Sequence, residues 1–217
     1  MPKEDLVSKI YDELRAQILT YRLSPGVKIS DMEVARKMGI SRTPVREALN
    51  RLSEKGLVII KHNRGFTVST LTLKDINDIY TLREVLEGLS VKLAMERADK
   101  ELIKKLNDVH GKFRDLMEKD DIIGLQDLDE KFHDLIVIYS GNELLMQNLR
   151  NLHDRVRIAR RYTYGRVSGL KDTYAGHGKV LEQMVAGNSA MAVKAMQRHI
   201  RNAKKYLMEI LKKSEFA

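Results

Sequence analysis

The 217-residue sequence contains no cysteine, so disulfide bonds and thiolate metal sites are both excluded. It also has no apolar run near the ~20 residues that a membrane-spanning helix needs. The N-terminal residues lack the apolar core of a secretory signal peptide. Nothing in the sequence indicates export or membrane insertion, and we therefore expect a cytoplasmic protein.

Positive charge is in excess and unevenly distributed. The chain carries 39 lysine and arginine residues against 30 aspartate and glutamate residues, a formal net charge of +9. Residues 1–72 hold 13 cationic and 8 acidic side chains, and residues 73–217 hold 26 and 22, so the net charge is denser in the first third. This excess favours a polyanionic partner, without distinguishing DNA from RNA or anionic lipid.

Residues 41–52 combine helical hydrophobic spacing with cationic and hydroxyl side chains. The apolar members recur on one helix face and are expected to pack on a core: Val45, Ala48, Leu49 and Leu52. The others are left for solvent or a ligand: Ser41, Arg42, Thr43, Arg46 and Asn50. Arginine can bind guanine edges or phosphates, and hydroxyls can fix phosphates. The segment is typical of a DNA-reading helix, with an ordinary surface helix as the alternative for this window alone.

The neighbouring segments complete a winged helix-turn-helix pattern. Residues 29–38 predict a short helix that opens at Ser30 or Asp31, and Gly39 supplies the turn before the next helix. The apolar set of this short helix is expected to be Met32, Val34, Ala35 and Met38. Residues 57–60 and 66–68 predict two short strands joined by a basic hairpin tip, which would be the wing.

Residues 6–70 resemble the winged helix-turn-helix domain of the GntR family of bacterial transcription regulators. The matching runs are LSPG at residues 23–26, GISRTPVREAL at 39–49, GLV at 56–58 and RGFTV at 64–68. The resemblance implies a DNA-binding domain over residues 1–72. It implies that DNA is contacted by Ser41, Arg42, Thr43 and Arg46 in the recognition helix and by Arg64 and Gly65 in the wing, which would enter the minor groove. Relatives often have a polar residue where Met32 stands, so one phosphate contact is expected to be missing.

The remaining residues, 73–217, are expected to form an all-α domain, because strand signals are almost absent after residue 70. Residues 72–75 resemble a capping box with Asp in place of Glu, and they predict the start of a helix. The expected core face of that helix is Ile76, Ile79, Leu82, Leu86, Leu89 and Leu93. Further helices are expected near residues 100–119, 122–139, 143–164, 169–186 and 189–213. An antiparallel bundle of six or seven helices would bury these apolar faces.

Three histidines lie on the apolar faces of three different predicted helices. Asp129 and His133 are four residues apart and project from one face, while His177 and His199 lie on two later helices. Three imidazoles and a carboxylate that converged in a bundle would suit Zn, Ni, Mn or Fe, with coordination positions open to water or a ligand. The alternative for each histidine alone is a core residue satisfied by an ordinary hydrogen bond.

This second half resembles the FCD ligand-binding domain of the FadR subfamily of GntR regulators. The resemblance rests on residues 129–133, on Gly141-Asn142-Glu143-Leu144, and on His177 and His199. Metal-binding members hold a divalent metal through residues that match Asp129, His133, His177 and His199. They usually have Glu-His where this chain has Gly176-His177, a change expected to weaken support of the metal ligand. His110 and His153 have no family match and are expected to be solvent-side or boundary residues.

The resemblance also implies an effector, because open metal coordination attracts an organic carboxylate that an arginine could orient. Arg83 matches a position where relatives place an arginine near the cavity, and a surface pair with Glu87 is its alternative role. We thus expect a ligand-responsive homodimer that binds a short palindrome of double-stranded DNA. Two other functions stay open: a constitutive regulator whose helical domain only dimerises, and a metal-dependent hydrolase.

Overall fold

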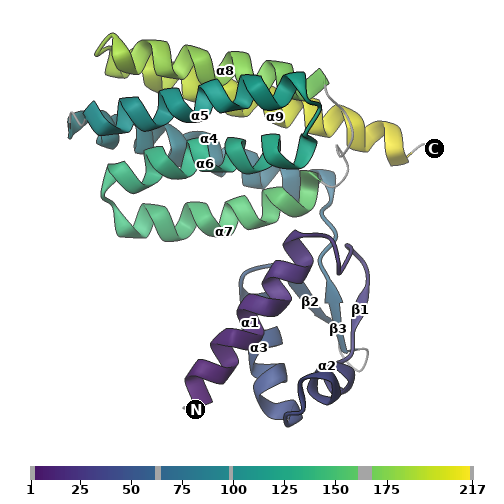
Figure 1. The fold of residues 1–217 in the computed structure, drawn as a ribbon. Helices are drawn as coiled ribbons and strands as arrows, with labels where there is room; N and C mark the ends of the chain where they lie inside the picture. Colours follow the sequence, from purple (N-terminus) through teal and green to yellow (C-terminus); the bar gives the residue numbers. More distant parts are fainter. Residues whose placement is uncertain (1–2, 62–64, 98–99, 161–167, 216–217) are drawn as a thin grey trace. The chain divides into compact units, whose positions relative to one another are not determined.

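The structure is a computed structural model that describes residues 3–61, 65–97, 100–160 and 168–215. Contacts between Cα atoms divide the chain into two compact units. The first contains Met1–Thr72 and Asp154–Arg161, and the second contains Leu73–His153 and Tyr162–Ala217. Figure 1 shows the elements of both units.

The first unit contains a helix-turn-helix. Its helices are α1 (Lys3–Leu19), α2 (Asp31–Met38) and α3 (Arg42–Glu54). The Ser30 hydroxyl caps α2 by accepting a hydrogen bond from the backbone N–H of Glu33 at 3.2 Å. Gly39 ends α2 with a φ of 66°, a left-handed conformation that glycine adopts without steric cost. The short helix, the glycine turn and the second helix were all predicted from the sequence, and the structure confirms them.

Helix α3 packs on α1 and α2 through one apolar face. Its buried residues are Pro44, Val45, Ala48, Leu49 and Leu52, and this set includes the four that were predicted. The expected core of α2 is wrong in part: Ala35 is buried, whereas Met32 is 60% exposed and Met38 is 40% exposed. The eight-residue helix turns only a narrow face toward α3, so its outer apolar residues stay in contact with solvent.

Three short strands complete the first unit. They are β1 (Lys28–Ile29), β2 (Val58–Lys61) and β3 (Gly65–Val68), in the order β1-β3-β2 with antiparallel pairing. Val58 lies opposite Val68, and both Ile29 and Ile60 lie opposite Phe66. The hairpin of β2 and β3 confirms the predicted wing. The two-residue strand β1 was not predicted, because two residues are too few to show an alternating pattern.

The second unit is a bundle of long helices. They are α4 (Leu73–Glu96), α5 (Lys100–Glu118), α6 (Ile122–Ser140), α7 (Glu143–Arg160), α8 (Ser168–Val185) and α9 (Ser189–Glu215), and the end of α7 from Asp154 onward is grouped with the first unit. The most extensive packing joins α4 with α9, α8 with α9, and α5 with α6. The helices start and end within a few residues of their predicted bounds. Within the part of the chain that the structure describes, none of the helices could span a membrane.

The predicted core face of α4 is wrong in part. Ile76 and Ile79 are buried as expected, but Leu82 is 49% exposed and Leu89 is 39% exposed. The helix instead turns a face with polar residues inward, and Arg83 and Glu87 are each 1% exposed. Leucine periodicity identified the wrong face because the inner face carries a buried ion pair, which a search for apolar residues does not detect.

Candidate functional site

The predicted DNA-contacting residues of α3 lie on its solvent side. Ser41, Arg42, Thr43 and Arg46 are all exposed, while the opposite face of the helix is buried. The guanidinium of Arg46 lies over the Phe66 ring of β3, 5.8 Å from its centroid. This start of α3 offers two cations, two hydroxyls and backbone N–H groups to a ligand, which suits phosphate and base contacts.

Asp31, at the start of α2, holds both arginines of this surface. Its carboxylate accepts two hydrogen bonds from Nη2 of Arg42, at 3.1 and 3.0 Å, and one from Nη1 of Arg46 at 3.3 Å. The Asp31 side chain is 13% exposed, whereas the two arginine side chains are 56% and 59% exposed. The sequence suggested Asp31 only as a possible helix start, because its pairing with arginines 11 and 15 residues later depends on the packing of α2 against α3. A phosphate that binds either arginine must compete with Asp31.

The wing contributes one described residue of the predicted interface. Gly65 is exposed at the start of β3 and has a φ of 78°. An added Cβ would meet no atom within 4 Å, so the glycine is required by its backbone conformation and not by crowding. Arg64, the other predicted wing residue, lies outside the described residues.

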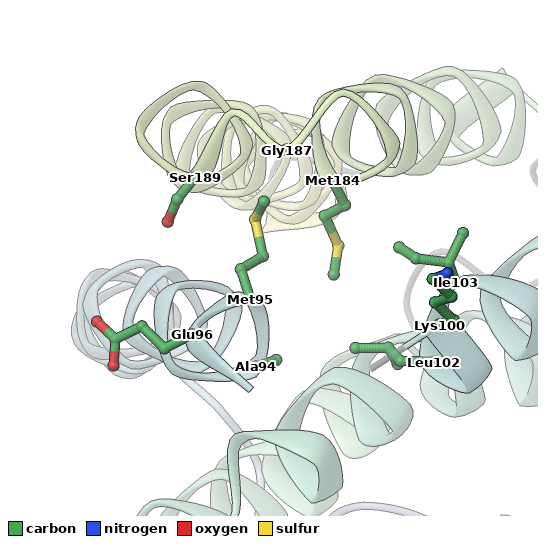
Figure 2. A pocket seen from close by; sticks show the side chains of 9 residues that line it. All are labelled: Ala94, Met95, Glu96, Lys100, Leu102, Ile103, Met184, Gly187 and Ser189. Carbon is green, nitrogen blue, oxygen red and sulfur yellow. The ribbon is translucent and has the colours of Figure 1, made fainter. Parts of the chain in front are cut away.

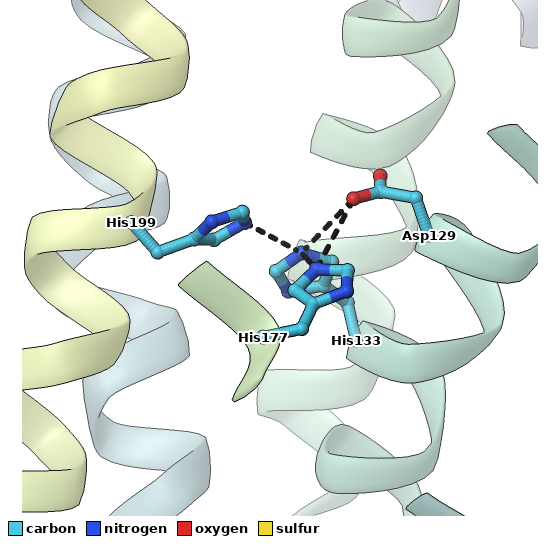
Figure 3. A group of neighbouring side chains, drawn as sticks. All are labelled: Asp129, His133, His177 and His199. Atoms are coloured by element: carbon cyan, nitrogen blue, oxygen red, sulfur yellow. Dashed lines mark hydrogen bonds and ion pairs between the residues drawn. The ribbon is translucent and has the colours of Figure 1, made fainter. Parts of the chain in front are cut away.

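The second candidate site is a buried cluster in the helical bundle (Figure 3). Asp129 and His133 project from α6, His177 from α8 and His199 from α9, and their ligand atoms lie within 4.8 Å of one another. All four residues are buried, with exposures between 1% and 6%. The structure therefore brings together all four residues that the sequence identified as candidate metal ligands.

The spacing within the cluster fits a metal ion. Nε2 of His133 lies 3.4 Å from Nε2 of His177 and 3.3 Å from Nε2 of His199. Oδ1 of Asp129 lies 3.2 Å from Nε2 of His177 and 3.7 Å from Nε2 of His133. Ligands held about 2.0–2.1 Å from a tetrahedral metal lie roughly 3.3–3.4 Å apart. Three imidazole nitrogens and one carboxylate oxygen are also a donor set that borderline divalent metals prefer.

The electrostatics of the cluster agree with its geometry. Burial lowers the pKa of His177 to about 4 and lowers the pKa of His199 well below its ordinary value. Burial acts in the same direction on His133, but the carboxylates of Glu87 and Asp129 raise its pKa to about 9. The lowered pKa values favour the neutral form of His177 and His199, which is the form in which an imidazole can bind a metal ion.

Arg83 belongs to a buried ion pair next to this cluster. Its Nη2 lies 2.5 Å from Oε1 of Glu87, and both side chains are 2% exposed. Glu87 also binds Nδ1 of His133 and accepts from Nε2 of His153 at 3.2 Å. Within the described chain, Nη1 of Arg83 is buried and has no hydrogen-bond partner. The sequence suggested the pairing of Arg83 with Glu87 as a surface contact, but the structure places this pair in the protein interior.

The two histidines without a family match have ordinary partners. His153 is 8% exposed, so its expected boundary position is wrong, and it contacts Glu87 and Asp134. His110 is half-buried, stacks on Tyr174 at a centroid distance of 4.1 Å, and bonds the Tyr174 carbonyl oxygen at 3.1 Å. Neither side chain belongs to the cluster of four.

A hollow of about 300 Å³ lies at another part of the bundle (Figure 2). It is lined by Ala94, Met95, Glu96, Lys100, Leu102, Ile103, Met184, Gly187 and Ser189. Its wall is mainly apolar, and it includes no member of the histidine cluster. The hollow and the cluster of candidate metal ligands therefore lie at different places in the bundle.

Comparison with known proteins identifies two families. The model of the bacterial regulatory proteins of the gntR family matches residues 6–68, and the FCD domain matches residues 78–202. The Nta operon transcriptional regulator of Aminobacter aminovorans is 37% identical over 147 residues, which are 65% of this chain and 67% of that protein.

Solved structures share the fold. E. coli McbR/YncC has a TM-score of 0.81 at 22% identity, over 94% of this chain and 97% of that chain. The Zn²⁺-bound FCD domain of the transcriptional regulator TM0439 has a TM-score of 0.54 at 19% identity, over 66% of this chain and 98% of that chain. At these identities the likeness shows a common fold alone.

Proposed function

The chain belongs to the gntR family of bacterial regulatory proteins and carries an FCD domain, and from this premise we propose that it is a ligand-responsive regulator. It is a transcription regulator with a DNA-binding helix-turn-helix. The metal-dependent hydrolase is set aside, because both matched domains and the relatives belong to regulators. We place the DNA-binding domain in residues 1–72 and the effector domain in residues 73–217, which enclose the two matched segments.

DNA binding is assigned to the exposed start of α3 and to the wing. Arg42 and Arg46 would contact base edges or phosphates, and Ser41 and Thr43 would anchor the backbone. Gly65, with Arg64, would bring the wing to the minor groove. The exposure of the four α3 side chains and the positive φ of Gly65 support these roles.

The observation that carries the proposal is the convergence of four buried ligand atoms in the bundle. Asp129, His133, His177 and His199 would hold a divalent metal ion, with Zn, Ni and Mn as the candidates. When bound, such an ion supplies a Lewis-acidic position for a carboxylate oxygen. The Zn²⁺-bound FCD domain of similar fold supports this assignment.

The proposed effector is a small organic carboxylate. Glu87 occupies Nε and Nη2 of Arg83, which leaves Nη1 as a buried donor with no partner in the described chain. A buried donor of this kind is costly unless an acceptor reaches it. A carboxylate oxygen would satisfy it, and this supports Arg83 as the effector-binding residue.

We further propose that the protein acts as a homodimer on a palindromic operator, since a two-fold dimer reads two-fold-related half-sites. Apolar side chains exposed on one face of α4 support self-association. Leu82, Val85 and Leu89 are 49%, 60% and 39% exposed, and their spacing places them along a single stripe. Burial of this stripe against a second copy would remove it from water.

The proposal can be tested by DNA binding under controlled metal and ligand conditions. Fragments selected from genomic DNA would give an operator, and its affinity would be measured by fluorescence anisotropy with chelator, with added metal, and with a panel of dicarboxylates and tricarboxylates. We expect metal and one class of carboxylate to change the affinity of the natural protein but not of Asp129→Ala. An operator affinity that does not change with chelator, metal or any carboxylate would favour a constitutive regulator whose helical domain only dimerises.

A further inference from the structure

Glu87 is a fully buried carboxylate that the sequence suggested only as a surface partner of Arg83. It lies in the middle of α4 and is 1% exposed. Its Oε1 accepts from Nε of Arg83 at 2.8 Å and from Nε2 of His153 at 3.2 Å. Its Oε2 binds Nδ1 of His133. Three side chains from three helices, α4, α6 and α7, thus meet on one carboxylate.

The contact with His133 decides which nitrogen of that ring is available. A neutral imidazole carries one proton, and the nitrogen without the proton is the one that can bind a metal. A carboxylate accepts hydrogen bonds and cannot donate them, so Glu87 keeps the proton of the neutral ring on Nδ1. Nε2 then carries the lone pair, and it is Nε2 that faces His177 and His199 at 3.4 and 3.3 Å.

The guanidinium of Arg83 holds the Glu87 carboxylate in place, and Glu87 in turn holds the His133 ring. The guanidinium holds Oε1 through Nε and Nη2, so Oε2 is left toward the imidazole. Both charges are 2% exposed, and burying them is costly unless they are paired. A helix that needed only packing would place apolar residues at these two positions. The pair is therefore not explained by packing alone, and its contact with His133 suits a role in orienting that ring.

We propose that Glu87 is a positioning residue for the metal centre, which orients His133 and holds it as the tautomer whose Nε2 can coordinate. The inference rests on the proposed metal centre of Asp129, His133, His177 and His199. Carboxylate partners of metal-bound histidines fix ring orientation and raise the basicity of the ligand, and their loss typically weakens metal affinity by about 10- to 100-fold.

The test compares Glu87→Gln with a matched control, Glu84→Gln, in the full-length protein. Glu84 also lies on α4 and also pairs with an arginine, Nη1 of Arg201 at 3.0 Å, but it does not belong to the cluster. Zn²⁺ affinity would be measured by competition with a chelating dye. We expect Glu87→Gln to weaken it by about 10- to 100-fold, and Glu84→Gln to leave it unchanged.

A second readout reports on the tautomer and not on stability. In long-range ¹H–¹⁵N spectra of the Zn²⁺-loaded protein, one histidine should show a strongly downfield Nδ1 proton from its bond to a carboxylate. We expect this signal to be lost in Glu87→Gln and kept in Glu84→Gln. Unchanged affinity and an unchanged signal in Glu87→Gln would overturn the inference.

Two further outcomes are distinguishable. Natural protein that binds none of Zn²⁺, Ni²⁺ and Mn²⁺ would refute the metal centre itself, and the inference would fall with it. If Glu87→Gln alone does not fold, the variant Arg83→Met/Glu87→Gln removes both buried charges together. That variant should be folded by circular dichroism yet show the same loss of affinity, and natural affinity in it would overturn the role of Glu87.

Discussion

Replacement of Arg83 by methionine tests the buried ion pair most sharply. Methionine has a similar length and no charge, so Arg83→Met leaves Glu87 buried at 1% exposure without its guanidinium partner. Breaking a buried pair by removing one partner costs about 3–5 kcal/mol, whereas an exposed pair contributes about 0–1 kcal/mol. For a chain of this size each kcal/mol lowers the unfolding midpoint by about 2–4 °C, so we expect a fall of roughly 6–20 °C.

The assay is thermal unfolding followed by circular dichroism, with a chelator present so that metal binding does not contribute. Arg83→Met/Glu87→Gln is the control, because removal of both charges is often close to neutral. It should lie nearer to the natural protein than Arg83→Met does. A loss below about 1 kcal/mol in Arg83→Met would match an exposed pair, and it would refute the buried arrangement.

Three other perturbations have defined outcomes. An added Cβ at Gly176 would collide with the His199 ring. Gly176→Ala should therefore weaken Zn²⁺ binding in dye competition, although alanine favours a helix by ~1 kcal/mol over glycine. Unchanged Zn²⁺ affinity would contradict the close approach of Gly176 to His199. Asp31→Asn releases Arg42 and Arg46 from their ion pairs, so the affinity of this variant for random duplex DNA should rise several-fold at low salt. The slope of log affinity against log salt concentration should become steeper by about 1. Burial acts to raise the pKa of Asp31, but Arg42 and Arg46 bring it below the ordinary value; the carboxylate is therefore ionised at neutral pH, and the effect should be the same at pH 6 and pH 8. Chelator should lower the unfolding midpoint of metal-loaded protein by roughly 5–11 °C, since a ligand at 100 times its Kd contributes about 2.7 kcal/mol. An equal shift in Asp129→Ala would show that the cluster is not the metal site.

The helices of this protein were largely predictable because local signals mark them. Gly39, the cap at Ser30 and the apolar faces of α3 and of most bundle helices act within a few residues of one another. Strand β1 escaped prediction because its two residues take their conformation from pairing with β3, which is remote in sequence. The exposure of Met32 and Met38 on α2 was also missed. The spacing of apolar residues predicts which of them share a helix face, but not whether another element covers that face.

The four cluster residues could be named from the sequence, whereas their supporting residues could not. Spacing placed Asp129 and His133 on one helix face and His177 and His199 on the apolar faces of two later helices, and the family resemblance joined the four as a ligand set. The burial of Glu87 was not predicted, because it lies on α4 opposite the leucines that seemed to define the core. A polar pair at positions 83 and 87, repeated by Ser90, was the available signal, and only the packing of α4 against α6 and α9 shows that it is buried.

The central claim is that the four buried side chains form a metal centre, and elemental analysis tests it most directly. The untagged natural protein would be compared with Asp129→Ala and His199→Ala, with helicity monitored by circular dichroism. We predict about one divalent ion per chain in the natural protein, and loss of that ion in both variants while helicity is retained. No bound metal after incubation with Zn, Ni and Mn, or full retention in either variant, would contradict the account.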